Sequence, residues 1–157
     1  MSVLAAGPHD PVVVRAGDAE HLPEIGHYLL ADASASNGAL SAHRIQLARG
    51  ADGAVPHRHN HSSELFFIID GALKLLVGSE IITAGSGDFL VVPPGCDHAF
   101  RADLNNTADA LIVITPGVER FAYLRQVARI RRGEAGRDSL LTEQDRYDTH
   151  FVTSPAW

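Results

Sequence analysis

Three histidines and one glutamate, placed in two short stretches of the chain, form a ligand set that suits a metal ion. His57, His59 and Glu64 lie close together, and His98 follows much later in the chain. Imidazole nitrogens combined with one carboxylate favour a divalent transition metal such as Fe, Mn, Ni, Co or Zn. Because successive side chains of a strand alternate between its faces, His57 and His59 at positions i and i+2 point the same way. We therefore expect His57, His59, Glu64 and His98 to bind one divalent ion.

The spacing around these residues resembles the paired motifs of the cupin superfamily. The first motif is matched without a gap by His57, His59, Glu64 and Gly71, and the second is matched at every spacing by Gly87, Pro93, Gly95 and His98. Ala51 stands where the first motif opens with glycine, and Ala102 stands where the second closes with asparagine. Neither position supplies a ligand, so these differences concern turn geometry. The resemblance implies an all-β fold, a small cupin-type β-barrel (jelly roll or double-stranded β-helix).

The remaining pattern predicts many short strands followed by one helix. Apolar runs separated by turn residues predict strands over residues 26–30, 39–47, 64–69, 72–77, 80–83, 88–92, 98–101 and 110–115, with a turn at Asp70 and Gly71. Such a series without intervening helices indicates a sandwich or barrel. Thr115 as N-cap and Pro116 at the first helical position predict a helix over about 117–132. We expect a single domain over residues 1–157, with a barrel core at about 39–115 and a C-terminal tail at 139–157 that packs on the barrel.

Composition and charge exclude several classes of function. A chain of 157 residues fits one domain with a proper core. Its net charge of −6 argues against a nucleic-acid partner, and the single cysteine, Cys96, excludes an internal disulfide framework. We find no signal segment and no apolar run near the roughly 20 residues that cross a bilayer. A cytoplasmic protein without a membrane partner is the resulting expectation.

Two residues of the site leave alternatives open. Glu64 either only binds the metal or also acts as the catalytic general base when substrate displaces it. His61 shares the parity of His57 and His59, but Glu64 takes the fourth ligand position, so His61 is interpreted as a rim residue. A purely structural metal is the other interpretation of the set, although structural zinc sites are closed and usually rich in cysteine.

Side chains of matching parity are expected to line a substrate pocket beside the metal. A pocket with a metal at its base and aromatic walls suits a planar, hydrophobic molecule that carries oxygen. Packing of the barrel core explains most of the same residues almost equally well. The predicted lining consists of Phe66, Ile68, Phe100, Ile112, Ile114 and His43.

From about residue 45 to the end, the chain resembles the single-cupin quercetin dioxygenase group. The match includes the segment 116–121 and the closing residues from Tyr147 to Trp157. By this resemblance, the metal binds a phenolic or enolic oxygen of a flavonol-like small molecule, Glu64 takes the proton, and dioxygen cleaves the ring. The resemblance also implies a homodimer. Because one barrel hosts many reactions, a non-oxidative isomerase, lyase, cyclase or decarboxylase and a small-ligand-binding protein remain as alternatives.

Overall fold

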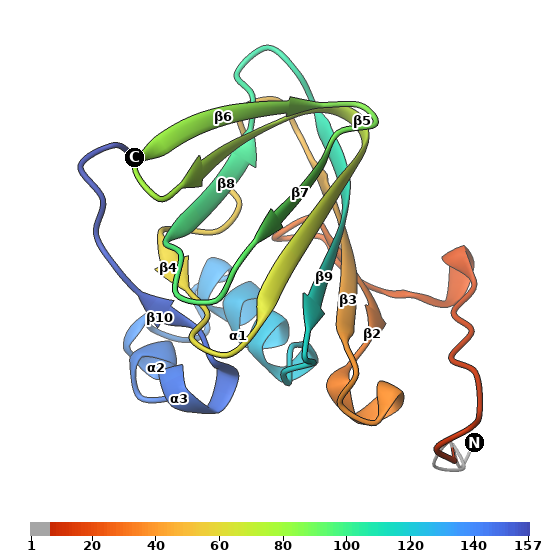
Figure 1. The fold of residues 1–157 in the computed structure, drawn as a ribbon. Coiled ribbons are helices and arrows are strands. Elements are labelled where there is room, and N and C mark those ends of the chain that lie inside the picture. Colours follow the sequence, from red (N-terminus) through yellow and green to blue (C-terminus); the bar gives the residue numbers. More distant parts are fainter. Residues whose placement is uncertain (1–6) are drawn as a thin grey trace.

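One long strand, β5 (Ser63–Val77), connects the two halves of the sheet. The structure is a computed structural model that describes residues 7–157 (Figure 1). The first part of β5 pairs with β9 (Ala108–Thr115) and β7 (Phe89–Val92), and its second part pairs with β6 (Glu80–Gly85) and β8 (His98–Ala102). Beyond β9 the order continues through β3 (Ser41–Leu47) and β2 (His27–Ala31) to β1 (Glu20–Leu22). Beyond β8 it continues through β4 (His57–Arg58) to β10 (His150–Phe151).

The strands curve around one apolar core (Figure 1). Every second residue of β9 is buried, which is the burial pattern of a strand with one face on the core. Fully buried side chains from both halves of the sheet meet there: Ile45, Phe66, Ile68, Leu73, Leu75 and Ile112. The predicted all-β, jelly-roll-type barrel with a C-terminal helix is confirmed, although the hydrogen-bonded order runs from β1 to β10 and does not close into a ring. Each predicted strand overlaps an observed one, whereas β1 and β10 were not predicted, and β4 is the short strand that the spacing of His57 and His59 implied.

The turn predicted at Asp70 and Gly71 is wrong. Both residues lie inside β5, where the register with β9 shifts between Ile68 and Asp70. Gly71 has a φ of 76°, and a Cβ at this position would lie 1.8 Å from the carbonyl oxygen of Thr107. A glycine inside a strand commonly marks such a bulge or close backbone approach. The chain therefore bends here from one half of the sheet into the other instead of reversing.

The C-terminal helix begins later than predicted. Helix α1 spans Phe121–Arg131, because the backbone before it is held by other partners. Thr115 is the last residue of β9, and the amide of Gly117 donates to the carbonyl of Gly38 at 2.8 Å. The amide of Arg120 donates to the Asp32 carboxylate at 2.7 Å. Thr115 and Pro116 therefore do not cap a helix.

Helix α1 covers one end of the barrel (Figure 1). Its Leu124 and Ala128 pack against Leu22, Ile25 and Leu29 in a second apolar cluster. The remaining helical elements are short: the 3₁₀ turns Ala16–Asp18 and Ala33–Ser36, and the helices α2 (Asp138–Leu141) and α3 (Gln144–Tyr147). In the described part of the chain, no helix is long and apolar enough to cross a membrane.

The C-terminal tail packs on the barrel through β10. His150 and Phe151 pair with Arg58 and His57 of β4, and the amide of Val152 donates to the carbonyl of Pro56 at 3.1 Å. The tail therefore forms part of the wall next to the strand that carries His57.

The bend in β5 generates a stability prediction. Gly71→Ala should lower the free energy of unfolding by about 3 kcal/mol, because the new methyl group meets the backbone of residue 107 and the residue must keep a positive φ. Gly78→Ala is the matched control: its φ is 63° but nothing lies within 4 Å of the added Cβ, so a loss of about 1 kcal/mol is expected. Urea unfolding measures both values, and equal losses would contradict the steric role of Gly71.

Candidate metal centre

Four buried side chains converge inside the barrel at the predicted metal site. His57 lies on β4, His59 follows that strand, Glu64 lies on β5, and His98 begins β8. His57 and His98 are directly opposite each other in the pairing of β4 with β8. One ligand atom from each of the four residues lies within 4.8 Å of the others, and each residue is at most 3% exposed.

Backbone carbonyls orient all three imidazole rings. The Nδ1 atom of His57 lies 2.8 Å from the carbonyl oxygen of Val55, that of His59 lies 2.6 Å from Asp148, and that of His98 lies 3.0 Å from Cys96. A nitrogen beside a carbonyl oxygen must donate, so Nδ1 carries the hydrogen and Nε2 of the neutral ring presents a lone pair. Such second contacts are typical of histidines that bind metal.

The Nε2 atoms point at the carboxylate of Glu64. The distances from its Oε2 atom are 3.9 Å to His57, 2.9 Å to His59 and 2.5 Å to His98. Lone pairs on three nitrogens and one carboxylate oxygen repel one another at this range unless a cation or a proton lies between them. The donor set, its burial and its convergence therefore fit a divalent transition metal.

Electrostatics within the cluster hold Glu64 in its charged form. When a proton rather than a metal ion lies between these atoms, Nε2 of His59 and His98 donates to the carboxylate. Burial alone would raise the pKa of Glu64, but the charge of His98 and these hydrogen bonds outweigh it and hold the pKa well below its usual range. Burial lowers the pKa of His57 well below its ordinary value. Burial also acts to lower the pKa of His98, but the adjacent Glu64 outweighs it and raises that pKa. The carboxylate is thus available as a ligand.

His61 lies outside the group of four and is exposed. Its amide donates to the carboxylate of Asp148 at 3.0 Å, as does the amide of Asn60 at 2.8 Å. Asp148 itself is 5% exposed and adopts a φ of 44°. This residue of the tail therefore holds both the loop after β4 and, through its carbonyl, the ring of His59. Sequence analysis missed Asp148, because nothing in the local pattern links it to residues so far away in the chain.

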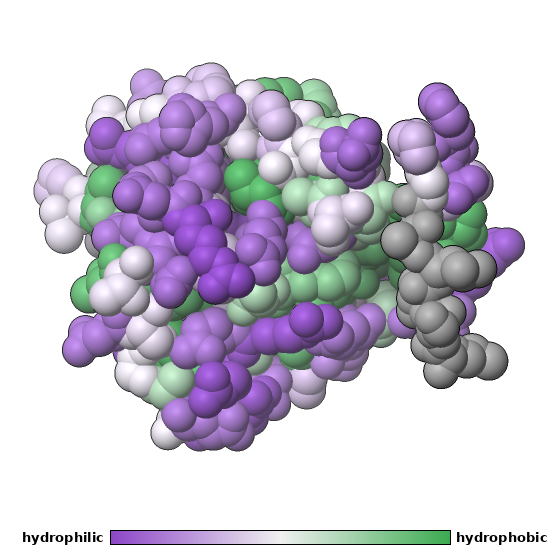
Figure 2. Space-filling model, turned by 90° about the horizontal axis from the view of Figure 1, so that it is seen from below, coloured by the Kyte–Doolittle hydropathy of each residue, from purple (hydrophilic) through white to green (hydrophobic). Residues whose placement is uncertain are grey.

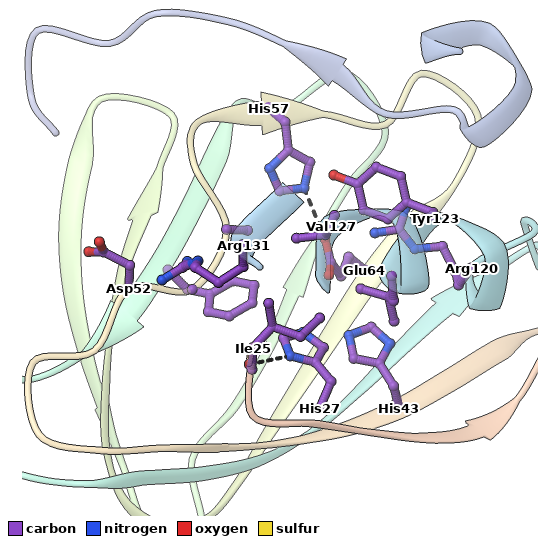
Figure 3. Close-up of a pocket in the computed structure, with 14 residues that line it drawn as sticks. Ile25, His27, His43, Asp52, His57, Glu64, Arg120, Tyr123, Val127 and Arg131 are labelled. Carbon is purple, nitrogen blue, oxygen red and sulfur yellow. Dashed lines mark hydrogen bonds and ion pairs between the residues drawn. The ribbon is translucent and has the colours of Figure 1, made fainter. Parts of the chain in front are cut away.

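A small inner cavity of about 60 Å³ adjoins the metal centre. Of the four ligand candidates, His57 and Glu64 line it, so a molecule in the cavity would meet these two residues (Figure 3). Its other walls come from β2 and the residue Ile25 before it, β3, the loop before β4, β8, and helix α1 with Arg120 before it. The residues are Ile25, His27, His43, Asp52, Gly53, Ala54, Phe100, Arg120, Tyr123, Leu124, Val127 and Arg131.

The structure places two of the six residues predicted to line a substrate pocket at a cavity and the other four in the core. His43 and Phe100 line the inner cavity. The other four side chains are fully buried and line neither this cavity nor the outer groove described below: Phe66, Ile68, Ile112 and Ile114. They point inward as their parity predicts, but they fill the interior, as side chains do in small barrels.

A larger outer groove of about 960 Å³ shares part of its lining with the inner cavity. Shared residues include His57, Phe100, Tyr123 and Val127. The groove lies between the barrel and the C-terminal segments, and its remaining apolar walls include Ile130, Leu140, Leu141, Phe151 and Trp157. The face seen from below is mostly hydrophilic, with apolar surface between the polar residues (Figure 2). The groove volume is within the range of small-molecule sites.

Sequence analysis missed five polar residues of the inner cavity, namely His27, Asp52, Arg120, Tyr123 and Arg131. His27 was not among the predicted site residues, but it is 6% exposed and its ring stacks on His43 at 5.2 Å. The strand predicted over residues 26–30 was a usable signal, because alternation along a strand places His27 on the same face as Leu29, and the structure shows that face buried. No comparable signal marked Arg120, which precedes a helix whose position depends on tertiary packing.

Comparison with known proteins adds a family match and a distant relative. Residues 43–114 match the family model described as Cupin domain. The chain is 26% identical over 110 residues to the quercetin 2,3-dioxygenase of Bacillus subtilis (strain 168), a stretch that covers 69% of this chain and 32% of the relative. The chain thus spans about a third of the length of that relative.

Solved structures with a similar fold include proteins of different activity. A Streptomyces PAC13 variant with uridine has a TM-score of 0.57 at 13% identity, covering 71% of this chain and 87% of that chain. The polyketide cyclase RemF from Streptomyces resistomycificus has a TM-score of 0.55 at 18% identity, covering 66% of this chain and 78% of that chain. At these identities the likeness concerns the fold alone.

The geometry of the cluster predicts its metal stoichiometry. Protein stripped with chelator should take up one divalent ion per chain, measured by calorimetric titration with Co²⁺ and by elemental analysis. His98→Ala should weaken this affinity by about 100-fold or more, since it removes one of four ligands. His61→Ala is the matched control and should retain wild-type affinity. Equal affinity in the wild type and His98→Ala would rule out His98 as a ligand.

Because His27 is buried, we expect the fold to lose stability in acid. Burial lowers the pKa of His27 from 6.5 to about 4. The unfolded chain therefore binds this proton first, so the stability is complete above pH 6.5 and is lost as the pH falls from 6.5 toward 4. The loss reaches about 3 kcal/mol at the acid end.

Urea unfolding of chelator-treated protein from pH 8 to 4 tests this effect. The slope of stability against pH should be shallower for His27→Gln than for the wild type, whereas His9→Gln, at an exposed position, should keep the wild-type slope. Identical slopes in all three proteins would show that His27 does not titrate in this way.

Proposed function

We propose that this chain, whose residues 43–114 match the Cupin domain family model, is a metal-dependent dioxygenase acting on a phenolic or enolic small molecule. The observation that carries the proposal is the buried group of three histidines and one glutamate, two of which border a cavity. A site whose ligands include no cysteine and whose cavity reaches them is suited to chemistry rather than to a closed structural ion. The distant likeness to a quercetin 2,3-dioxygenase supports the choice of reaction.

The chain supplies the metal ligands and a proton acceptor. His57, His59, Glu64 and His98 would hold the ion, which when bound supplies a Lewis acid for a substrate oxygen. Glu64 is the residue best placed to accept the hydroxyl proton, because it lines the cavity and carries a charge, whereas the hydrogen-bonded Nδ1 atoms fix the three imidazoles. Both oxygen atoms of dioxygen would enter the cleaved product.

The inner cavity and the outer groove would hold different parts of the substrate, its reactive head and its larger body. The inner cavity of about 60 Å³ has room for only a few atoms, so the reacting oxygen and its carbon would enter it. The outer groove of about 960 Å³ has space for a flat ring system against Leu140, Phe151 and Trp157. A flavonol-like molecule, with a hydroxyl at one edge of a planar body, matches this division.

A non-oxidative reaction is the second candidate. The inner cavity is lined by His27, His43 and Tyr123, which are able to donate or accept protons. Such a lining favours a metal-assisted isomerase, lyase, cyclase or decarboxylase in which the substrate itself is the only reactant. Dioxygen dependence separates this reaction from the first.

Oxygen uptake tests the proposed function. With metal-loaded protein and a panel of flavonols, we expect one dioxygen consumed per substrate lost, and no turnover under nitrogen. Glu64→Gln should reduce kcat by about 100-fold or more. Glu80→Gln, at an exposed position on β6, is the matched control and should retain full activity.

Metal content must be measured for each variant, so that loss of the ion is distinguished from loss of the proton acceptor. Turnover that proceeds equally well under nitrogen would replace the dioxygenase with the non-oxidative candidate. Tight ligand binding without turnover in either atmosphere would indicate a binding protein.

A further inference from the structure

We propose that Arg120 forms a binding subsite for an anionic oxygen in the inner cavity, so that the substrate carries a carboxylate or an ionised hydroxyl at its head. This inference rests on the proposed function for the position of the reacting group, and it adds the charge of the substrate. The subsite lies beside the four ligand candidates and includes none of them.

Arg120 is a buried cation without a carboxylate partner. It is 5% exposed, and its Nε atom is buried without a hydrogen bond. Among residues 7–157, the ion pairs formed by arginine all involve more exposed side chains: Arg44, Arg58, Arg125, Arg129, Arg132 and Arg146. A buried charge left without a counter-ion is costly, which makes an anionic ligand the natural partner.

The contacts that Arg120 does make hold it in place and leave one edge available. Its Nη1 atom donates to the hydroxyl of Thr149 at 2.7 Å, and its guanidinium lies 4.2 Å from the ring centre of Tyr123. A guanidinium can bind a carboxylate through its Nε and Nη2 atoms. Arg44 does so, because these two atoms donate to the carboxylate of Asp109 at 2.8 and 2.6 Å. The Nε edge of Arg120 is suited to the same two-pronged contact with a carboxylate.

Neutral histidines complete the subsite. Figure 3 shows Glu64 between the Arg120–Tyr123 pair and the rings of His43 and His27. His43 is 2% exposed and its Nδ1 atom has no hydrogen-bond partner. Burial lowers the pKa of both histidines, so they are uncharged at neutral pH, and the cations that line the cavity are Arg120 and Arg131. Arg120 and His43 both line the cavity, and each has a buried nitrogen without a hydrogen-bond partner.

Positively charged side chains also outnumber acidic ones along the outer groove. Arg101, Arg131 and Arg137 line it, against the single acidic residue Asp52. Positive potential along the entrance favours anions over neutral or cationic molecules. The fitting ligand is therefore a flat apolar body with an anionic oxygen at the end that enters first.

A matched pair of ligands tests the subsite without any turnover. The probes are 3-hydroxy-2-naphthoate and its neutral carboxamide, which share shape and hydroxyl but differ in charge. Calorimetric titration under nitrogen, on metal-stripped and on metal-loaded protein, gives the ratio of the two dissociation constants. We expect the wild type to prefer the acid by about tenfold or more in both forms.

Substitutions assign the preference to Arg120. Arg120→Met should reduce the ratio to about one, and Arg120→Lys should leave part of it because the charge remains. Arg137→Met, which removes a groove arginine instead, is the matched control and should retain most of the preference. A merely structural role of Arg120 would weaken both probes equally and leave the ratio unchanged.

Three outcomes would overturn the proposal: a wild type that binds acid and amide alike, a folded Arg120→Met that keeps the preference, or a preference lost in Arg137→Met instead. If Arg120→Met does not fold, the test compares the ratio of dissociation constants of Arg120→Lys with that of the wild type. If the dioxygenase assay shows no oxygen uptake, the ratio of the two dissociation constants is still a valid test of the subsite. If that ratio is one, oxygen uptake with neutral flavonols still tests the proposed function.

Discussion

Three backbone carbonyls orient the buried cluster of histidines, because they fix which nitrogen of each imidazole carries its hydrogen. With Nδ1 donating at His57, His59 and His98, the three Nε2 lone pairs turn toward one carboxylate oxygen of Glu64. Acceptors so close together and so deeply buried repel one another without a cation or proton. The barrel therefore carries a local electrostatic cost that metal binding removes, and the surrounding strands must be rigid enough to maintain it.

That rigidity comes from segments far apart in the chain. β5 carries Glu64 and, through its bend at Gly71, pairs with strands of both halves of the sheet, including β8 with His98. The tail contributes from the other side, because β10 pairs with the strand of His57 and Asp148 holds the loop and ring of His59. Loss of either support would move a ligand, so residues outside the cluster control its geometry.

Charge is distributed unevenly around the inner cavity. His57 and Glu64 line it together with Arg120 and Arg131, and Glu64 lies between Arg120 and the neutral rings of His27 and His43 (Figure 3). The molecule as a whole carries a net charge of −6, yet arginines outnumber acidic residues along the outer groove. This local reversal of sign is the basis for expecting an anionic ligand in a protein whose overall charge would repel one.

The sequence by itself determined the ligand set and the fold class, because both depend on short-range patterns: histidine spacing, alternation along strands, and turn residues between them. Predictions from the sequence were wrong at positions whose contacts come from distant parts of the chain. Asp70 and Gly71 look like a hairpin turn until Thr107 approaches Gly71, and Thr115 looks like an N-cap until β9 and the loop near Asp32 hold the backbone that follows. Likewise, parity placed Phe66 and Ile112 inside the barrel, but only the packing of helix α1 and the tail decided which inward side chains border a cavity and which fill the core. Asp148 and Arg120 became part of the site for the same reason, since their roles arise from contacts between segments that local sequence does not encode.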